Sequence, residues 1–170
     1  MKKILLPVLM FLFFATSINA QRIAIVDVES ILSVLPQYQK AQDDIDKISA
    51  QWRQDISQEY DKIKSMYNKY QAEQVLMSEE VRVEYEDEIM EKEKEVRELQ
   101  KRRFGPEGDL FRRRQELVTP IQDEVFNAIE NYASSKGYDI VFDKAGAAGL
   151  LFANEDFDKT EEVKRELGIR

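Results

Sequence analysis

The amino-acid sequence predicts an α+β fold, in which a long antiparallel helical hairpin (a coiled-coil arm) projects from a small β-rich body. Three observations predict it. Between Pro36 and Pro106 the chain runs 69 residues without a proline, and Gly105 is its first glycine. Short runs of β-branched residues lie on either side of this stretch. An apolar series spaced by three and four residues threads it, which is the pattern of a coiled-coil seam. The series is Ile45, Ile48, Trp52, Ile56, Tyr60, Ile63, Tyr67 and Tyr70.

The arm is expected to consist of two long helices joined by a short turn. The outgoing helix covers about 37–76, and Ser78, in a turn over 77–80, caps the returning helix. Over 79–103, 17 of 25 residues are charged, which suits a helix that is solvated on most of its circumference. We therefore assign 37–119 to the arm, with the turn at its tip.

Two glycines and a proline interrupt the returning helix. Proline lacks an N–H and glycine weakens a helix, so the hydrogen-bond ladder should fail at Gly105, Pro106 and Gly108, opposite residues near Gln51. These residues lack the spacing of a dinucleotide-binding loop, and we predict a mechanical hinge or bulge. Further along, Pro120 can begin or kink the next helical portion.

The remaining segments, 21–36 and 120–170, form the predicted body. Apolar and β-branched runs predict strands over 22–26, 138–142 and 148–152, the last two as a hairpin. Three strands leave two edges with unpaired backbone groups, and pairing between subunits would satisfy them, so we predict an oligomer. The residues expected in its shared core are Ile23, Ile25, Val26, Ile140, Phe142, Leu150 and Phe152.

The first 20 residues have the three parts of a secretory signal peptide. Two lysines precede a short apolar run over 4–15, and the small residue Ala20 follows at the expected cleavage point. The run is short for a membrane span, so a retained anchor is the weaker alternative. We expect an exported mature chain that begins at Gln21.

Composition excludes several functions. The mature chain has 23 basic and 33 acidic residues, a net charge of −10, which argues against nucleic-acid binding. Cysteine and histidine are both absent, and histidine is the commonest general base and metal ligand. The acidic runs over 84–88 and 91–95 fan outward on a helix instead of converging on a cation. We expect no metal, no cofactor and no enzymatic activity.

The order of these segments, together with short motifs, carries a family resemblance. Ile23-Ala24-Ile25-Val26-Asp27 opens the mature chain, and Gly-Tyr-Asp-Ile-Val-Phe-Asp occupies 137–143. Leu150-Leu151-Phe152 follows, and then a helix start, Asp158-x-Thr160-x-x-Val163. Over essentially the whole mature chain this resembles the Skp/OmpH family of periplasmic chaperones, most specifically in the first strand and the tail.

The resemblance implies a homotrimer in the periplasm. In this family the strands of three subunits form a central β-barrel, the trimerisation body, and three hairpins surround a cavity. The cavity holds unfolded outer-membrane proteins without nucleotide, so the implied function is that of an ATP-independent holdase. No catalytic residue is carried over.

Six arm residues are candidate contacts for unfolded clients: Trp52, Ile56, Tyr60, Tyr67, Tyr70 and Tyr85. Residues at helical spacing more often pack in the seam between two helices, and both roles can hold at different positions. Tyrosine favours the client role slightly, because its polar tip tolerates partial exposure.

Charge along the arm bears on other partners. The outer arm, 61–97, has 11 acids and 7 bases, and this net charge of −4 disfavours contact with lipopolysaccharide or anionic membranes. Basic clusters lie at 101–103 and 112–114. The alternative function is a coiled-coil spacer or adaptor of the envelope that recognises one folded partner. A cytosolic hairpin chaperone would share the architecture but not the signal peptide.

Overall fold

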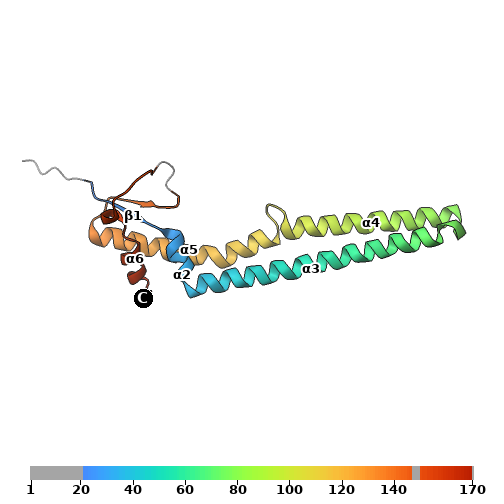
Figure 1. The fold of residues 1–170 in the computed structure, drawn as a ribbon, viewed down its shortest axis with the longest axis horizontal. Coiled ribbons are helices and arrows are strands. Elements are labelled where there is room, and N and C mark those ends of the chain that lie inside the picture. Colours follow the sequence, from blue (N-terminus) through green and yellow to red (C-terminus); the bar gives the residue numbers. More distant parts are fainter. Residues whose placement is uncertain (1–20, 147–149, 170) are drawn as a thin grey trace, which may run out of the picture. The chain divides into compact units, whose positions relative to one another are not determined.

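The computed structural model describes residues 21–146 and 150–169, so the predicted signal peptide over 1–20 lies outside the described residues. Contacts divide the chain into two compact units. The sheet unit contains the residues up to Val28 together with 128–168, and the hairpin unit contains 29–127. Figure 1 labels the elements of both units.

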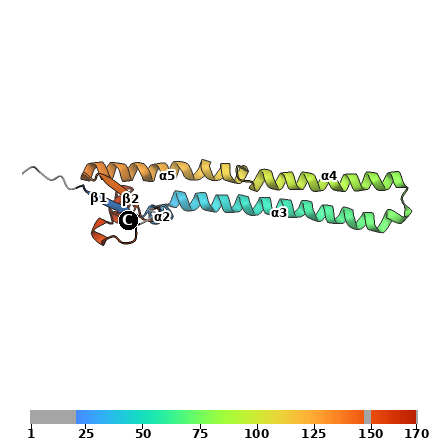
Figure 2. The ribbon, with the colours of Figure 1, turned by 90° about the horizontal axis from the view of Figure 1, so that it is seen from above.

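Two long helices dominate the hairpin unit. After the short helix α2 (Val28–Val34), helix α3 (Pro36–Glu73) begins at a proline, whose missing N–H costs nothing in a first turn. Helix α4 (Glu79–Phe104) returns antiparallel to α3, as Figures 1 and 2 show. The two long helices confirm the predicted hairpin.

The turn between these helices has the predicted cap, but it covers 74–78 and so begins three residues earlier than the predicted 77–80. Helix α3 passes into a 3-10 turn, η1 (Gln74–Leu76), without a glycine. The backbone N–H of Val81 then donates to the Ser78 hydroxyl at 3.4 Å, and Glu79 and Glu80 occupy the first turn of α4. Acidic residues are favourable there because the start of a helix carries partial positive charge.

A break separates α4 from the next helix, α5 (Asp109–Lys136). It lies where Gly105, Pro106 and Gly108 predicted it. Helix α5 continues through Pro120, so this proline neither begins nor ends a helix. Gly137, with φ of +69°, stops α5 in the left-handed conformation that glycine tolerates best.

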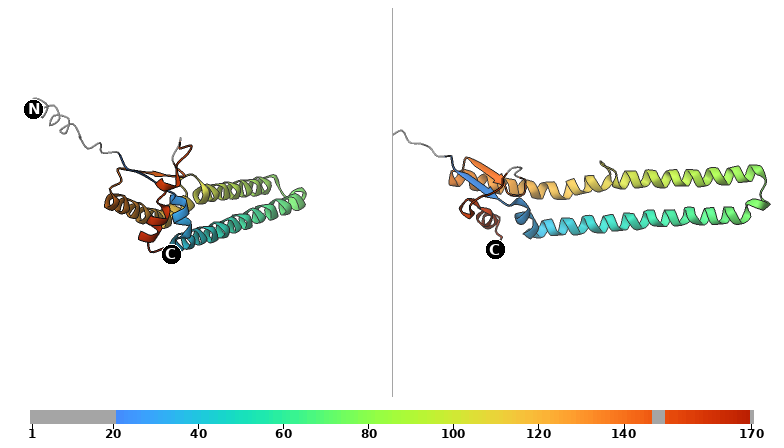
Figure 3. Two further views of the ribbon diagram at one scale, coloured as in Figure 1. Left: turned by 60° about the vertical axis from the view of Figure 1, so that its left-hand side comes forward. Right: turned by 45° about the horizontal axis from the view of Figure 1, so that its top comes forward.

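The sheet unit has two described strands, which are parallel. Strand β1 (Ile23–Val26) pairs with β2 (Ile140–Asp143), with Ile23 opposite Ile140 and Val26 opposite Asp143. Figure 3 shows the two strands side by side. β2 begins two residues later than predicted because Tyr138 still belongs to the turn after α5, where its ring stacks on Tyr132 at 6.1 Å.

The predicted hairpin between the last two strands was wrong. β2 pairs with β1, and the described part of the predicted third strand, 150–152, has no secondary structure, while 147–149 lie outside the described residues. The second edge of β1 is occupied instead by the tail, because the Lys159 N–H donates to the Ile25 carbonyl at 2.8 Å. Among the described residues, 150–152 thus pair with neither strand, and the edge of β2 away from β1 has no partner strand.

The tail closes the sheet unit. After a 3-10 turn, η2 (Glu155–Phe157), helix α6 (Thr160–Glu166) follows, and Gly168 has a φ of +73° just beyond its end. Val163 of α6 is fully buried, as is Ala24 of β1. The final helix thus begins in the predicted segment and covers part of the small core.

Candidate functional site

The predicted seam between α3 and α4 is present, and two of the six candidate client contacts pack in it, Ile56 within its buried cluster and Tyr70 against that cluster. Ile56, Ile63, Ile89 and Val96 form a buried cluster, with Ile89 only 2% exposed. Four partly buried side chains pack against this cluster: Met66, Tyr70, Leu99 and Phe104. The Ile56 side chain is therefore buried between the two helices and is not available to a client.

Three of the candidate tyrosines reach across to the opposite helix. Tyr60 donates its hydroxyl hydrogen to Gln100 Oε1 at 3.3 Å, and Tyr67 donates to Glu93 Oε1 at 2.9 Å. Tyr70 donates to Glu86 in the same way. Tyr60 and Tyr67 remain 43% and 40% exposed, so their rings flank the seam instead of filling it.

These hydrogen bonds change the proton affinity of the groups that make them. The hydrogen bond from Tyr67, followed by that from Arg97, lowers the pKa of Glu93, while the hydrogen bond to Glu93 raises the pKa of Tyr67. The hydrogen bond to Glu86 likewise raises the pKa of Tyr70. The pair of Tyr67 and Glu93 is thus held as a neutral phenol and a carboxylate.

The remaining tyrosine, Tyr85 of α4, is partly covered by two side chains of α3. Its ring stacks against Tyr70 with centroids 6.5 Å apart, and the Lys69 ammonium lies 5.5 Å from its centroid. A cation over an aromatic face is attracted by the ring quadrupole. Tyr85 therefore stabilises the hairpin near its tip and is only partly exposed.

Trp52 lies opposite the break in the returning helix, close to the position expected from Gln51. Its ring meets Phe104 edge to face at 6.3 Å, and the Arg103 guanidinium lies 4.4 Å from its centroid. Arg103 also pairs with Asp109 at 2.9 Å, which joins the end of α4 to the start of α5. Trp52 thus anchors the α4 side of the break.

The break itself requires both of its glycines. A Cβ on Gly105 would lie 2.4 Å from the Lys101 carbonyl oxygen, and one on Gly108 would lie 2.7 Å from the Arg102 carbonyl oxygen. Helical bonding continues to Gly105, whose N–H donates to Lys101 at 2.8 Å, and the N–H of Gly108 then closes a tight turn onto Gly105 at 2.9 Å. The segment is therefore a compact bulge, and its role as a hinge stays a prediction.

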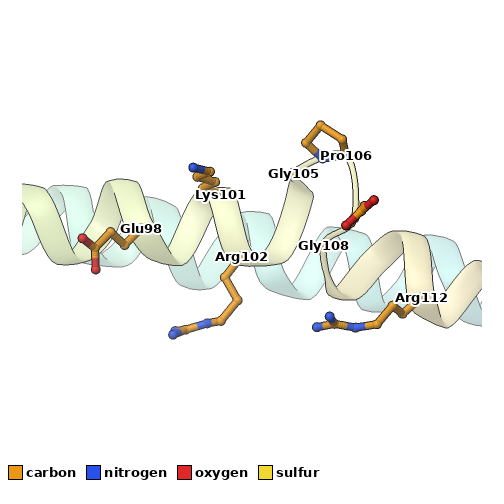
Figure 4. A pocket seen from close by; sticks show the side chains of 8 residues that line it. Glu98, Lys101, Arg102, Gly105, Pro106, Gly108 and Arg112 are labelled. Carbon is orange, nitrogen blue, oxygen red and sulfur yellow. The ribbon is translucent and has the colours of Figure 1, made fainter.

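A shallow groove of about 550 Å³ lies along this bulge. Figure 4 shows Arg102 and Arg112 on one side of it, with Pro106 at the apex of the loop. Arg112 bonds to Asp109, and this hydrogen bond, with the charge of Arg103, lowers the pKa of Asp109. The groove is mixed in charge, because it is lined by Glu98, Lys101, Arg102, Gly105, Pro106, Glu107, Gly108 and Arg112.

The residues predicted for a shared core divide into two groups. Ile25 and Val26 of β1 are buried within the chain, and Ile23 is partly buried. The other four are exposed, although they are large and apolar. Their exposed fractions are 39% for Ile140, 43% for Phe142, 39% for Leu150 and 85% for Phe152, and the neighbouring Leu151 is 98% exposed.

Polar side chains at the strand ends serve the backbone. Asp139 accepts from the Arg22 N–H at 2.8 Å, and Asp143 accepts from Val28 N–H at 3.3 Å. Asp158 accepts from both the backbone N–H and the hydroxyl of Thr160, at 3.0 and 2.5 Å. Burial opposes ionisation of Asp158, but these hydrogen bonds outweigh it and lower the pKa of its carboxyl.

Sequence reasoning missed several exposed apolar residues of the hairpin unit. Val75 and Leu76 at the tip are 88% and 89% exposed, while Val83 and Met90 on α4 are 48% and 56% exposed. Val83 and Met90 stand seven residues apart, which is a signal in the sequence. It is easily overlooked because the stronger apolar series lies on α3.

The described residues, 21–146 and 150–169, contain no group of three or more acidic side chains arranged to hold a metal ion. None of their helices combines the length and apolar character needed to span a bilayer.

The fold defines a class of protein in which a long helical hairpin is joined to a small two-stranded sheet. The chain belongs to the family of OmpH-like outer membrane proteins, whose model matches residues 22–167. It is also similar in fold to the crystal structure of an OmpH-like outer membrane chaperone from Caulobacter crescentus CB15. That similarity has a TM-score of 0.70 at 11% sequence identity and covers 88% of this chain and 85% of the other.

A comparison with curated protein sequences gives no match. The OmpH-like chaperones are a periplasmic, non-enzymatic family. The family resemblance found in the first strand and the tail is therefore confirmed, and membership places the chain among outer membrane chaperones.

Proposed function

We propose that this protein is an ATP-independent periplasmic holdase that binds unfolded outer-membrane proteins and prevents their aggregation. The observation that carries the proposal is the family match over residues 22–167, nearly the whole predicted mature chain. The signal peptide predicted over 1–20 supports export to the compartment where such clients are found.

We also propose that the working form is a homotrimer assembled through the sheet unit. Leu151 and Phe152, which are 98% and 85% exposed, support this, because isolated chains rarely leave neighbouring large apolar side chains in water. The edge of β2 away from β1, which has no partner strand among the described residues, supports it too, since unpaired strand edges favour pairing with another chain. Three hairpins of one assembly would then surround a single client.

Weak contacts suffice for this function. The hairpin unit offers scattered, partly exposed side chains such as Tyr60 and Tyr67 instead of one deep pocket. Several arms acting on one chain raise the effective concentration of each contact, so individual contacts exchange while the client stays enclosed. Release then needs only folding or transfer of the client, and no nucleotide.

An aggregation assay tests the proposal. An outer-membrane β-barrel unfolded in urea is diluted into buffer with the mature protein, and light scattering is followed beside a parallel assay with an unfolded soluble protein. We expect suppression at about one trimer per client without nucleotide. A variant that lacks residues 45–115 should stay assembled and lose the activity. Unchanged scattering with the full-length protein would overturn the proposal, and full protection by the shortened variant would place binding outside the arm.

One observation favours the second candidate, an envelope adaptor that recognises a folded partner. Val75 and Leu76 are almost fully exposed at the tip, and Glu73, Glu79 and Glu80 lie beside them in the sequence. Such a tip suits an apolar pocket with a basic rim. Loss of a stable complex after Leu76→Ser, with aggregation suppression unchanged, would support this alternative.

A further inference from the structure

The two faces of the hairpin formed by α3 and α4 differ in chemistry. On α3, Tyr60 and Tyr67 stand seven residues apart, so they lie on one line along the helix. Their hydrogen-bond acceptors, Gln100 and Glu93, also stand seven residues apart on α4. These paired lines must lie on the same side of the seam. We call this side the tyrosine face.

Met90 and Val83 extend the tyrosine face across α4. The buried Ile89 serves as the reference position on α4. Glu93 lies four residues after it, Glu86 three residues before it, and Met90 one residue after it. At 3.6 residues per turn these offsets rotate in the same sense, by about 40°, 60° and 100°. Met90 therefore lies beyond the hydrogen-bonded carboxylates on the same side, and Val83 occupies the same line seven residues earlier. Their exposed fractions of 56% and 48% agree with that position.

Two ion pairs lie on the opposite side of the hairpin, while the tyrosine face itself carries the pair between Arg97 and Glu93, which are 3.2 Å apart. Lys62 and Glu59 lie one and four residues before the buried Ile63, so they rotate in the opposite sense, and they are paired at 2.6 Å. Glu95 and Lys92 stand in the same relation to Val96 and are paired at 2.7 Å. We call this side the ion-pair face.

One exposed aliphatic side chain of α4 lies on the ion-pair face. Val81, in the first turn of α4, is 38% exposed, less than either Val83 or Met90. The ring of Tyr85 on this side is covered by Lys69. The two most exposed apolar side chains of α4, Val83 and Met90, are thus on the tyrosine face.

We propose that the tyrosine face is the surface of the arm that binds unfolded chains, a proposal that rests on the proposed function. Its apolar groups are separate: Tyr60 and Tyr67 are about 10 Å apart at the helical rise, and a row of polar groups divides them from Met90. A folded partner would call for a continuous apolar patch. An extended segment, with an apolar side chain every few residues, matches the interrupted pattern.

The chemistry of the face also selects the kind of segment. Phenol hydrogen bonds fix the tyrosine rings while leaving part of each ring exposed, and methionine adapts its shape to different neighbours. The carboxyl groups of Glu86 and Glu93 accept the tyrosine hydrogen bonds and lie between the apolar groups. The preferred ligand is therefore an extended apolar and aromatic segment, and its charge matters less because Glu93 is already paired with Arg97 at 3.2 Å on the same side.

The absence of cysteine from the chain allows a direct test. Single-cysteine variants V83C and M90C on the tyrosine face, and K62C and E95C on the ion-pair face, are labelled with a benzophenone cross-linker in the full-length mature protein. Each is mixed with a urea-unfolded outer-membrane β-barrel and irradiated. We expect at least about fivefold more adduct from the tyrosine face, since photo-cross-linking reports proximity. Equal yields on the two faces, or more from the ion-pair face, would overturn the proposal.

Two further measurements make the outcome unambiguous. Met90→Ser should weaken client affinity by roughly threefold to tenfold, the range expected for one apolar contact, whereas Glu95→Ser should leave it within twofold. Cross-links from V83C or M90C mainly to a second copy of this chain would assign the face to contacts between arms and overturn the proposal. If the unlabelled protein fails to suppress aggregation, the proposed function fails. If it succeeds and the faces cross-link equally, only the assignment of the face fails.

Discussion

The two units of this protein treat their apolar side chains in opposite ways. The hairpin unit buries its seam within one chain, with Ile89 and Val96 only 2% and 3% exposed. The sheet unit buries Ala24 and Val163 but leaves Leu151 and Phe152 in solvent. The first unit is complete as a folded element, whereas the second has the surface of an unfinished core. The short sheet unit, and not the long hairpin, is therefore the part whose large exposed side chains a second chain would cover in the proposed assembly.

The first test places the same charge on each unit and compares the effect on assembly. Phe152→Asp and Leu76→Asp alter side chains that are 85% and 89% exposed in the single chain. If Phe152 lies in a shared core, its replacement costs about 3 kcal/mol or more per assembly because the charge is buried without a partner. We expect Phe152→Asp to dissociate the oligomer, as measured by multi-angle light scattering at micromolar concentration, and Leu76→Asp to leave the mass unchanged. If the wild-type protein is itself monomeric, the exposed side chains of the sheet unit are not covered by other subunits, and this prediction is wrong.

A second test concerns the seam of the hairpin unit. Ile89→Ala removes a fully buried side chain and should lower the free energy of unfolding by about 2 to 4 kcal/mol, because a cavity replaces packed atoms. Met90→Ala, one residue later and 56% exposed, is the matched control and should change stability by less than about 0.5 kcal/mol. Urea denaturation measures both values, and hydrogen exchange over 56–96 should accelerate in Ile89→Ala alone. Similar losses in the two variants would mean that α3 and α4 do not pack in this register.

The third test sharpens the description of the break between α4 and α5. A Cβ on Gly108 would lie 2.7 Å from the Arg102 carbonyl oxygen and 2.9 Å from the Gly105 nitrogen, both of which are backbone atoms. We expect Gly108→Ala to cost about 1 to 3 kcal/mol, while Glu107→Ala in the same loop should be nearly neutral. Thermal unfolding compares them. Equal melting temperatures would show that the bulge relaxes freely.

The hinge prediction needs a separate measurement of motion. Replacing 105–108 with four alanines favours a continuous helix across the break, because alanine has the highest helix propensity. Spin labels at position 75 in different subunits should then report a narrower distance distribution than in the unaltered protein. An unchanged width would make the segment a fixed bulge and not a hinge.

The features that could be predicted from the sequence are those set by neighbouring residues. Ser78 followed by two acids predicts a helix start, and Gly105, Pro106 and Gly108 predict a break, wherever the chain lies in space. Strand partners are different, because β1 and β2 are more than 100 residues apart and pairing depends on the whole fold. The apolar pattern at 150–152 predicts a strand but not which chain supplies its neighbour.

The candidate site shows the same limit on a smaller scale. The spacing places Ile56 and Tyr60 in one apolar series. It does not tell which side chains are buried between the two helices and which lie at the exposed edge of that interface. In the structure Ile56 is buried and Tyr60 is 43% exposed. The antiparallel register with α4 decides between these positions, and it also determines that Tyr67 meets Glu93.

The fourth test uses the hydrogen-bonded group that fixes the tail of the sheet unit. The Thr160 hydroxyl accepts from the Asp27 N–H at 2.9 Å and donates to Asp158 Oδ1, and Thr160 is 6% exposed. Thr160→Val keeps the shape, leaves the N–H unsatisfied, and should cost about 1 to 3 kcal/mol. Ser33→Ala, which removes an exposed hydroxyl, is the control and should have little effect.

The stability lost in Thr160→Val should depend on pH. Burial opposes ionisation of Asp158, but its hydrogen bonds lower its pKa below the ordinary value of 3.8. The bond from the Thr160 hydroxyl, which the valine removes while the backbone N–H bond stays, therefore stabilises the fold most above that pH. As pH falls through the folded-state pKa, Asp158 is protonated in both states and this contribution is lost. The difference between variant and unaltered protein should therefore be constant above about pH 5 and shrink below about pH 4. A difference that grows on acidification would contradict this sign.

The smallest expected effect is that of Tyr67→Phe on the arm. This change removes the hydrogen bond to Glu93 but keeps the ring, and both groups are solvent-exposed, so the free energy of unfolding should change little. The pKa of Glu93 should nevertheless rise toward its ordinary value, because the Tyr67 hydroxyl is the main cause of its depression and Arg97 remains as the lesser one. Carboxyl NMR titration of the variant and the unaltered protein measures this. Client affinity should be retained, since the ring stays on the tyrosine face. If Tyr67→Phe abolished capture, the phenol hydroxyl and not the exposed ring would be the group that contacts the client.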